Sequence, residues 1–447
     1  MTVSRRHAIS VVDLAFGDCG KGTIVDFLVR AHAADLVVRF NGGPQAGHNV
    51  VTPDSRHHTF SQFGSGTFVP GTRTFLSRFM LIEPYALFRE EAHLRQIGVQ
   101  DAFERLLIDR RCVVITPIHQ AANRLRELAR GAAAHGTCGM GFGETVADML
   151  RHPDLMIRAG DLADRSRVAA RLAKIRELKR AELDDVILAV HGHPAAEPAL
   201  TTLLQPSWTD VALDHYTELG KLVGITDERG SERLLRESNA TVFEGAQGVL
   251  LDEDCGFHPH TTWSKTTFAN ADALLDESGF AGDRTRTGVL RSYFTRHGAG
   301  PFVSEDPFLR AALPEPHNDD HSWQGRFRVG PFDLVAARYA ADVVGRVDAL
   351  AVTHMDRYAA LGGRMCVRYD LDSGPLDRIP VRRSTTLQAQ AELTALLGRA
   401  TPVYESLPAG NPGIWLERIA GELGAPIQIV STGPTAADKR MLLRARS

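Results

Sequence analysis

Short apolar runs alternate with amphipathic stretches along most of this chain, and this alternation constrains its fold more than any other feature. Two stretches, 120–130 and 333–345, carry apolar residues three and four positions apart, as helices do. The alternation predicts an α/β protein in which helices surround a large central, mostly parallel sheet. The runs predicted as strands are 35–40 ("DLVVRF"), 111–117 ("RCVVITP"), 240–245 ("ATVFEG"), 347–354 ("VDALAVTH") and 426–433 ("PIQIVSTG").

Two sections depart from the alternation. The section from about 160 to 235 has helical spacing and little strand pattern, so we expect a helical subdomain inserted into a single domain that spans residues 1–447. The stretch 310–330 is polar and lacks periodicity, which predicts a long loop. Loops of this length inside a compact domain are more often functional than idle.

A cluster of small and charged residues separates the first predicted strand, residues 9–14, from a stretch with helical spacing. A tight turn would explain its glycines, because glycine adopts positive φ freely, but not its lysine. Free N–H groups at a helix N-terminus attract anions, and a lysine adds positive charge. The sequence therefore predicts a P-loop-like phosphate site, although a standard Walker A motif would need a glycine in place of Ala15. The cluster comprises Gly17, Asp18, Gly20, Lys21 and Gly22.

Composition narrows the partners and the compartment. With 23% charged residues and a formal net charge of −3, nothing favours nucleic acid or a membrane surface as a partner. No run of about 18 apolar residues is present to span a bilayer. The five cysteines are scattered without zinc or disulfide spacing, and Asp13 interrupts the first apolar stretch, which favours a core strand over a signal peptide. We therefore expect a cytoplasmic protein.

Four further motifs carry side chains suited to chemistry. His48 ends the glycine-rich "GGPQAGH", where the alternative is a structural turn with an exposed imidazole. Gln247 lies between two glycines in "EGAQGVLLD", where its amide can both donate and accept hydrogen bonds. Arg326 and Arg328 suit recognition of carboxylates or phosphates, unless they belong to a solvated loop. Asp356, just past a strand end in "THMD", resembles a carboxylate that accepts from guanine N1 and N2.

In order along the chain, these motifs resemble those of the adenylosuccinate synthetase family, from residue 8 to about 434. The family patterns G-D-E-G-K-G-K, G-G-x-N-A-G-H-T and E-G-A-Q-G-x-L-L-D correspond to "GDCGKGT", "GGPQAGHN" and "EGAQGVLLD". Its S-T-R-x-G-A-G-P-F, T-K-x-D and S-T-G-P correspond to "FTRHGAGPF", "THMD" and "STGP". The resemblance implies the family fold and a homodimeric, GTP-dependent ligase with Mg²⁺ as cofactor. Such an enzyme phosphorylates the 6-oxo group of a purine-like nucleotide and displaces the phosphate with an amino-acid amine, most simply that of aspartate.

The resemblance also implies a role for each matching residue. Asp18 would remove the proton from purine N1 and bind Mg²⁺ together with the Gly47 carbonyl. His48 would stabilise the phosphoryl group leaving GTP, and Gln247 would hold the 6-oxo group; Lys21 completes the catalytic set. The implied GTP site comprises Gly17, Gly20, Lys21, Gly22, Thr23, His354, Asp356, Ser431, Gly433 and Pro434. The implied acceptor site comprises Gln45, Thr137, Cys138, Arg151, Gln247, Thr262 and Arg326, and the amino-acid site Ser322, Trp323, Arg326 and Arg328.

Several positions depart from the family pattern and leave three functions open. One is the ligase just described, and another is a specialised paralogue acting on a modified purine, a deoxynucleotide or a C-nucleoside, or with a different amine. The third is a catalytically silent nucleotide-binding protein, against which the retained chemical side chains argue. A family arginine that reaches across the dimer falls near Arg151 or His152. The departures are Cys19 for an acidic residue, Thr23 and His354 for lysines, Gln45 for Asn, Cys138 for Thr, Met140 for Arg, and Ser322 and Trp323 for paired threonines.

Overall fold

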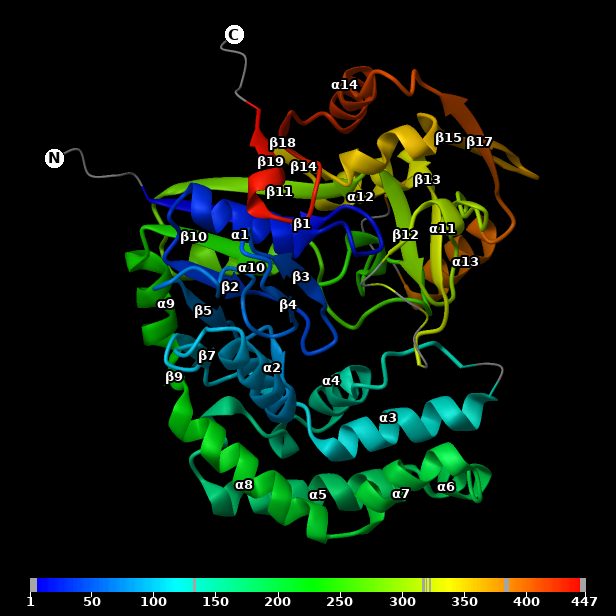
Figure 1. Cartoon of the computed structure of the whole chain (residues 1–447). Coiled ribbons are helices and arrows are strands. Elements are labelled where there is room, and N and C mark those ends of the chain that lie inside the picture. Colours follow the sequence, from blue (N-terminus) through cyan, green and yellow to red (C-terminus); the bar gives the residue numbers. More distant parts are fainter. Residues whose placement is uncertain are drawn as a thin grey trace, which may run out of the picture.

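A ten-stranded sheet runs through the molecule (Figure 1). The structure is a computed structural model that describes residues 6–131, 134–315, 318, 320, 323–381 and 386–442. All neighbouring strands pair in parallel except β19, which pairs antiparallel at one edge. The predicted α/β class with a mostly parallel central sheet is therefore confirmed. Across the sheet, the strands are β19 (Lys439–Met441), β18 (Ile427–Ser431), β14 (Ala349–Thr353), β11 (Asp283–Arg291), β1 (His7–Asp13), β10 (Ala240–Glu244), β2 (Leu36–Arg39), β5 (Arg73–Leu76), β7 (Leu106–Asp109) and β9 (Gly224–Thr226).

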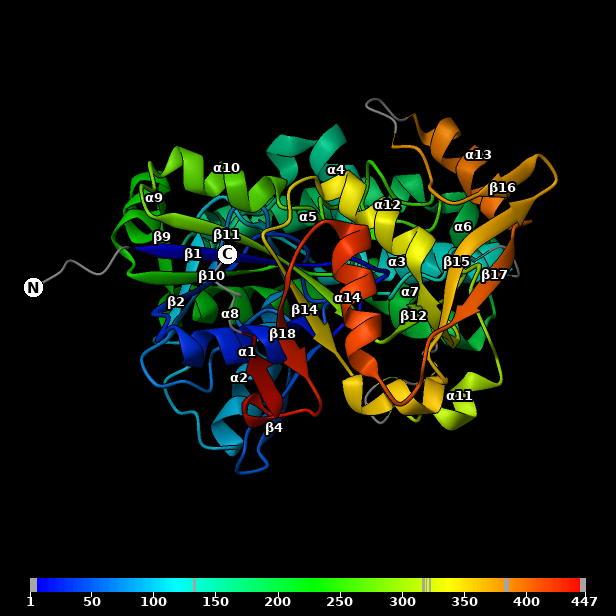
Figure 2. The same cartoon turned by 90° about the horizontal axis from the view of Figure 1, so that it is seen from above.

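Helices cover both faces of this sheet. Figure 2 shows α1 on one face and α10 and α12 on the other. None of the helices in the described ranges is long and apolar enough to cross a bilayer. The helices are α1 (Lys21–Ala31), α2 (Pro84–Gln96), α3 (Pro117–Arg130), α4 (Phe142–Arg151), α5 (Arg165–Glu182), α6 (Asp184–Ala189), α7 (Glu197–Leu204), α8 (Ser207–Leu222), α9 (Glu228–Glu237), α10 (Ala269–Glu277), α11 (Leu309–Ala312), α12 (Leu334–Val344), α13 (Leu387–Leu397) and α14 (Pro412–Leu423).

Helices α3 to α8 form a layer of their own at the bottom of Figure 1. They occupy the chain between β8 and β9, and they pack around a second hydrophobic core that contains Leu172, Tyr216 and Leu219. The section expected to be a helical insertion, about 160–235, contains α5 to α8. Its last part contains β9, which pairs with β7 and extends the large sheet, and α9.

Five further strands form a second sheet, and two short pairs complete the fold. The stretch 310–330, expected to be a loop, ends in a strand, because β13 begins at Phe327. Phe327 and Val329 are buried on either side of Arg328, a period-two pattern that the polar residues before it conceal. The remaining strands are β12 (Tyr293–His297), β13 (Phe327–Asp333), β15 (Arg364–Leu371), β16 (Gly374–Leu376) and β17 (Thr401–Ser406) in the second sheet, and the pairs β3 (His48–Val51) with β4 (His57–Phe60) and β6 (Leu81–Ile82) with β8 (Val113–Val114).

The central strands are buried on both faces, so large-to-small changes there should destabilise the fold. Leu36 on β2 is fully buried. We expect Leu36→Ala to lower the free energy of unfolding by about 2–5 kcal/mol, through lost burial and the cavity left behind. Leu188→Ala is the matched control, because Leu188 is 74% exposed on α6, and its effect should stay within about 0.5 kcal/mol. Urea unfolding followed by circular dichroism measures both, and equal losses would contradict the placement of β2 in the core.

Candidate functional site

A cavity of about 1170 Å³ opens at the carboxyl ends of the strands of the large sheet. Open parallel sheets bind ligands at this edge. The loops that follow β1, β2, β10, β14 and β18 all contribute to its wall, and the helical layer closes the other side. Predicted site residues that line the cavity are Gly17, Asp18, Gly20, Lys21, Gly22, Thr23, Gln45, Gly47, His48, Thr137, Cys138, Arg151, Gln247, Thr262, His354, Asp356, Ser431, Gly433 and Pro434.

The loop after β1 is organised by the carboxylate of Asp13, the last residue of that strand. One carboxylate oxygen accepts from the backbone N–H groups of Ala15 at 3.0 Å and Gly17 at 3.2 Å. The other accepts from the N–H of Cys19 at 2.9 Å and from Lys21 Nζ at 3.1 Å. Asp13 is 1% exposed, so these bonds lie out of water. In the sequence pattern Asp13 is only an interruption of an apolar run, although a lone acid directly before a glycine-rich loop is a signal for this role.

The segment from the loop after β2 into β3 approaches the segment from the loop after β1 into α1 closely. A Cβ added to Gly22 would lie 2.7 Å from the Cβ of His48, so only glycine allows this contact. Likewise, a Cβ on Gly248 would lie 2.1 Å from the carbonyl oxygen of Ala15, where the loop after β10 meets the same segment. The three loops therefore form one continuous wall.

His48 is held by Glu244, the last residue of β10. Their Nδ1 and Oε1 atoms lie 2.5 Å apart, and Ser65 donates to the same carboxylate through its N–H (2.9 Å) and hydroxyl. Burial alone would raise the pKa of Glu244, but Arg39 and the hydrogen bonds from His48 and Ser65 outweigh it and lower that pKa to about 2. Burial lowers the pKa of His48, and Glu244 offsets this only in part. We infer a neutral imidazole that donates from Nδ1 to an ionised Glu244, which leaves Nε2 for the cavity.

Asp18 presents its carboxylate from a left-handed backbone position, with φ of 59°. Its carbonyl oxygen accepts from the buried guanidinium of Arg291 at 3.0 Å. Its side chain is 27% exposed, and an oxygen of it lies 3.4 Å from Nε2 of His297. Sequence reasoning gave no role to His297 or Arg291, because both come from segments some 270 residues away.

Two glutamine amides line the cavity with unused hydrogen-bonding capacity. Gln247 has φ of 57°, and its buried Oε1 has no hydrogen-bond partner among the described residues. Both polar atoms of the Gln45 amide are likewise buried and unpaired within the described ranges. Buried polar atoms in proteins nearly always have partners, so these amides are suited to a bound ligand.

The loops after β14 and β18 form another end of the cavity. His354 also has a left-handed backbone, with φ of 56°. Burial, followed by Arg291 and Arg357, holds its pKa well below 6.5, so its ring is uncharged near neutral pH. Asp356 is partly exposed and lies 3.1 Å from Nε of Arg357. The hydroxyl of Thr23, on α1, donates to the carbonyl of Pro434 at 2.8 Å and joins the first turn of α1 to this end.

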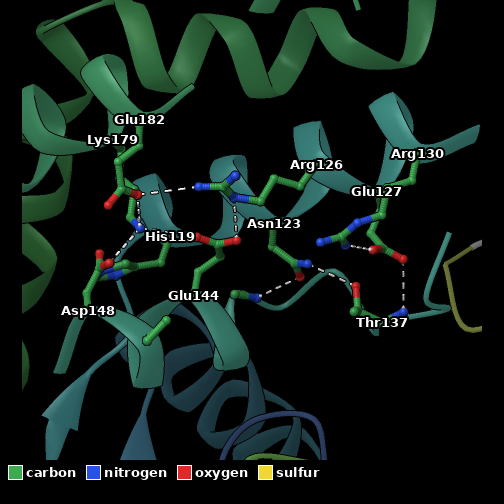
Figure 3. A network of polar contacts seen from close by, with 12 residues as sticks. His119, Asn123, Arg126, Glu127, Arg130, Thr137, Glu144, Asp148, Lys179 and Glu182 are labelled. Atoms are coloured by element: carbon green, nitrogen blue, oxygen red, sulfur yellow. Dashed lines mark hydrogen bonds and ion pairs between the residues drawn. The ribbon is translucent and has the colours of Figure 1, made fainter. Parts of the chain in front are cut away.

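A polar network fixes the helical wall of the cavity (Figure 3). Asn123 on α3 accepts from the N–H of Gly141 at 3.2 Å and donates to the Thr137 hydroxyl at 2.9 Å. Glu127, one turn further along α3, accepts from the N–H groups of Gly136 at 2.9 Å and Thr137 at 3.2 Å. The loop that carries Thr137 is therefore fastened to α3 from two sides.

The same network joins α4 to α5 through a buried lysine. Lys179 Nζ lies 2.6 Å from Asp148, 2.9 Å from Glu182 and 3.1 Å from Glu144. Glu144 also pairs with Arg126 at 2.9 Å, and both of these residues line the cavity. Figure 3 shows these charges meeting between three helices. Because the Lys179 side chain is fully buried, the position of α4 depends on this cluster.

Three positions that the family resemblance singles out on the helical wall differ in whether they line the cavity and in the hydrogen bonds they can make. Cys138 lines the cavity, and burial raises the pKa of its thiol, which therefore stays protonated and donates only weakly. Arg151 lines the cavity, is half exposed and pairs with Glu182 at 3.3 Å. Met140 is not part of the lining.

The predicted amino-acid residues lie apart from this lining. Ser322 falls outside the described residues, and Trp323, Arg326 and Arg328 are not among the residues that line the cavity. Arg328 donates to Glu305 and to the carbonyls of residues 298 and 300. Arg326 is 73% exposed and lies 3.7 Å from the same Glu305 carboxylate.

The chain is similar to known proteins over nearly its full length. A family model described as adenylosuccinate synthetase matches residues 10–440. The adenylosuccinate synthetase of Pseudomonas aeruginosa is 33% identical over 437 residues, which covers 95% of this chain and 96% of the relative. That of Vibrio parahaemolyticus is 30% identical over 454 residues, with the same shares of 95% and 96%.

Two solved structures share the fold. The fully ligated adenylosuccinate synthetase from Plasmodium falciparum gives a TM-score of 0.75 at 20% identity and covers 97% of this chain and 99% of its own. The succinoaminodeoxyadenylate synthetase of cyanophage S-2L, bound to dGMP and to dATP as an energy donor, gives 0.60 at 17% identity, with coverage of 98% and 95%.

We expect the conformation of the loop after β1 to depend on Asp13. Asp13→Ala should lower the free energy of unfolding by about 3–5 kcal/mol, because it leaves a buried ammonium and three N–H groups without their acceptor. Asp214→Ala is the control, because Asp214 makes an exposed pair with Arg165, and its loss should stay within about 1 kcal/mol. Guanidinium unfolding measures both variants. A loss for Asp13→Ala no larger than the control's would show that the loop does not depend on this carboxylate.

Proposed function

Because the chain belongs to the adenylosuccinate synthetase family, whose members are ligases that form C–N bonds, we propose that it carries out this type of reaction on a purine-like nucleotide. GTP would activate the 6-oxo group, and the amine of an amino acid, most simply aspartate, would replace it. One observation carries the proposal. Asp18 and Gln247 come from the loops after the neighbouring strands β1 and β10, His48 begins β3 after the loop that follows β2, and all three line a single cavity.

Asp18 is the proposed general base. It would take the proton from purine N1, so that negative charge develops on the 6-oxo oxygen as this oxygen attacks the γ-phosphoryl group of GTP. The amine would then attack C6, and the phosphate formed at the 6-position would leave. Gln247 supports the first step, because its amide faces the cavity and can hold the 6-oxo group.

His48 is proposed to stabilise the phosphoryl group as it leaves GDP. Since Nδ1 donates to Glu244, any further proton must be taken up on Nε2, the nitrogen left for the cavity. A bound polyphosphate favours that protonation, and the resulting cation counters the charge of the transferring group. The N–H groups at the start of α1 add positive potential at the same place. Lys21 also lines the cavity, with its ammonium paired to Asp13.

The site fits Mg²⁺ bound chiefly through the nucleotide. The described residues contain no group of three or more His, Cys, Asp or Glu side chains that could hold a metal. Mg²⁺ is ordinarily bound by one or two carboxylates together with substrate phosphates and water, a role that Asp18 and the Gly47 carbonyl can fill. When bound, the ion would neutralise charge on the transferring phosphoryl group.

The other predicted residues are proposed to bind the guanine base, the acceptor nucleotide and the amino acid. The loops with His354, Asp356, Ser431, Gly433 and Pro434 are proposed to hold guanine. The helical wall with Thr137, Cys138 and Arg151, together with Gln45 and Thr262, is proposed to hold the acceptor nucleotide. Ser322, Trp323, Arg326 and Arg328 are proposed for the amino acid, and the active form is proposed to be a homodimer.

A second candidate keeps the mechanism and changes the acceptor. Cys138, which lines the cavity, offers a weak thiol donor where the family pattern has a hydroxyl, and Met140, two residues further and outside the lining, stands where the pattern has a charged arginine. Hydrogen bonds to charged groups contribute about 1.5–3 kcal/mol each, so the two changes together could weaken an unmodified acceptor by about a hundredfold or more. These departures favour an acceptor other than inosine monophosphate.

We expect a C–N bonded product from GTP, Mg²⁺, aspartate and a panel of 6-oxopurine nucleotides, identified by mass spectrometry. Inosine monophosphate should be a poor member of the panel, with kcat/KM below about 10⁴ M⁻¹s⁻¹. Asp18→Asn is the control for chemistry and should lower kcat more than about tenfold while GTP still binds. Efficient turnover of inosine monophosphate would refute the altered acceptor. Nucleotide binding without phosphate release from any acceptor would refute the ligase.

We expect GTP to be preferred over ATP by at least about tenfold in kcat/KM. Adenine has no N1–H and no 2-amino group, so it would leave the Asp356 carboxylate unpaired. Asp356→Asn should reduce the preference, and Asp370→Asn, which changes a half-exposed acid on β15, should leave it unchanged. Steady-state kinetics with both triphosphates measure this. Equal values for the unmodified protein would contradict the assignment of Asp356.

A further inference from the structure

Three consecutive carbonyl groups in the segment between β18 and β19 are held by side chains. Lys439 Nζ donates to the carbonyls of Gly433 at 3.0 Å and Thr435 at 2.7 Å. The carbonyl between them, that of Pro434, accepts from the Thr23 hydroxyl at 2.8 Å. We call residues 431–435 the β18 loop; Ser431, Gly433 and Pro434 in it line the cavity. These three carbonyls are thus held by one residue of β19 and one of α1.

Lys439 acts on this loop from behind. It is 6% exposed, it is not part of the cavity lining, and it lies opposite Ser431 in the antiparallel pair of β18 with β19. Asp438, its neighbour, accepts from the N–H of Thr435 at 2.8 Å and from its hydroxyl at 2.7 Å. The loop therefore keeps its shape without a ligand. Among the described residues, Lys439 is the only buried cation that bonds this loop.

Two departures from the family pattern remove positive charge near this loop, so the charge of Lys439 matters more. The lysines expected beside the donor nucleotide are Thr23 and His354 here. Thr23 is neutral and bonds the β18 loop, and His354 is uncharged near neutral pH because burial lowers its pKa. Lys439 thus supplies buried positive charge at an end of the cavity where neither of those positions does.

We propose that Lys439 is a positioning residue for the donor nucleotide, whose ammonium holds the β18 loop in the shape that receives the purine base. The inference rests on the proposed function, in which this loop binds the guanine of GTP. Because Lys439 does not line the cavity, its effect should fall on nucleotide binding and leave the chemical step unchanged.

The charge on Lys439 can be changed within an accessible pH range. Burial lowers its pKa to about 8, although Asp438, Asp26 on α1 and Asp356 after β14 each oppose that shift. His354 also faces it and is uncharged. As pH rises through 8, the ammonium becomes an amine, and its hydrogen bonds to the two carbonyls lose the strength that the charge gives them. GTP binding should therefore weaken between pH 7 and 9.

The test compares two substitutions at this position. Lys439→Met removes both hydrogen bonds and should raise KM and Kd for GTP about tenfold at pH 7, with kcat within about twofold. Lys439→Arg keeps a cation that does not deprotonate in this range, so its KM should stay near that of the unmodified protein at pH 7. The unmodified protein's KM should rise about threefold more than that of Lys439→Arg between pH 7 and 9. Titration of GTP itself is common to both proteins.

Calorimetric GTP binding, without acceptor, accompanies the kinetics. Lys221→Met, on an exposed lysine of α8, is the control and should change nothing. If Lys439→Met does not fold, the comparison of pH profiles between the unmodified protein and Lys439→Arg decides alone. Unchanged KM and Kd, or parallel pH profiles, in a protein that releases phosphate would overturn the inference and leave the proposed function standing. GTP binding without phosphate release would overturn the proposed function, and the binding constants of the variants would still test the role of Lys439. Absence of GTP binding would overturn both proposals.

Discussion

The buried carboxylate of Asp13 is the interaction on which the rest of the site depends. It accepts hydrogen bonds from three backbone N–H groups and one ammonium at the end of the central strand β1. A loop rich in glycine loses much conformational entropy on folding, and here one ion supplies the bonds that order it. With that loop fixed, Gly22 can meet His48 and Gly248 can meet Ala15, so the neighbouring strand exits are placed against it.

Three of the side chains proposed to be functional are presented from strained backbone. Of five residues other than glycine with positive φ in the described ranges, Asp18, Gln247 and His354 line the cavity. Such conformations cost about 1–3 kcal/mol each and persist only where surrounding structure imposes them. The buried pair of His48 with Glu244 is also imposed by the surrounding fold, because His48 begins β3 of a two-stranded sheet and Glu244 ends β10 of the large sheet. Rigid placement of this kind suits the proposed reaction, in which a nucleophile is aligned with a phosphoryl group.

Local patterns predicted much of this structure, and long-range contacts account for what they missed. The runs assigned to β2, β10, β14 and β18 were correct, since apolar periodicity is a property of neighbouring residues. Glycine spacing likewise pointed to loops that the structure brings to one cavity. The partnership of His48 with Glu244 spans 196 positions, and that of Thr23 with Pro434 spans 411, so no spacing rule reveals them. The strand at Phe327 was missed because a polar run masks its short alternation.

The two hydrophobic cores support different parts of the proposed site. The loops with Asp18, Gln247 and Asp356 follow strands β1, β10 and β14, whose residues belong to the first core, whereas much of the helical wall lies on α3 and α4, whose residues belong to the second. Lys179 and its carboxylates hold that wall as a unit of its own. Substitutions in the helical layer and in the loop between α3 and α4, which holds Cys138 and Met140, can therefore accumulate without disturbing the loops proposed to bind phosphate. A lineage built in this way can explore new acceptors while its reaction stays the same.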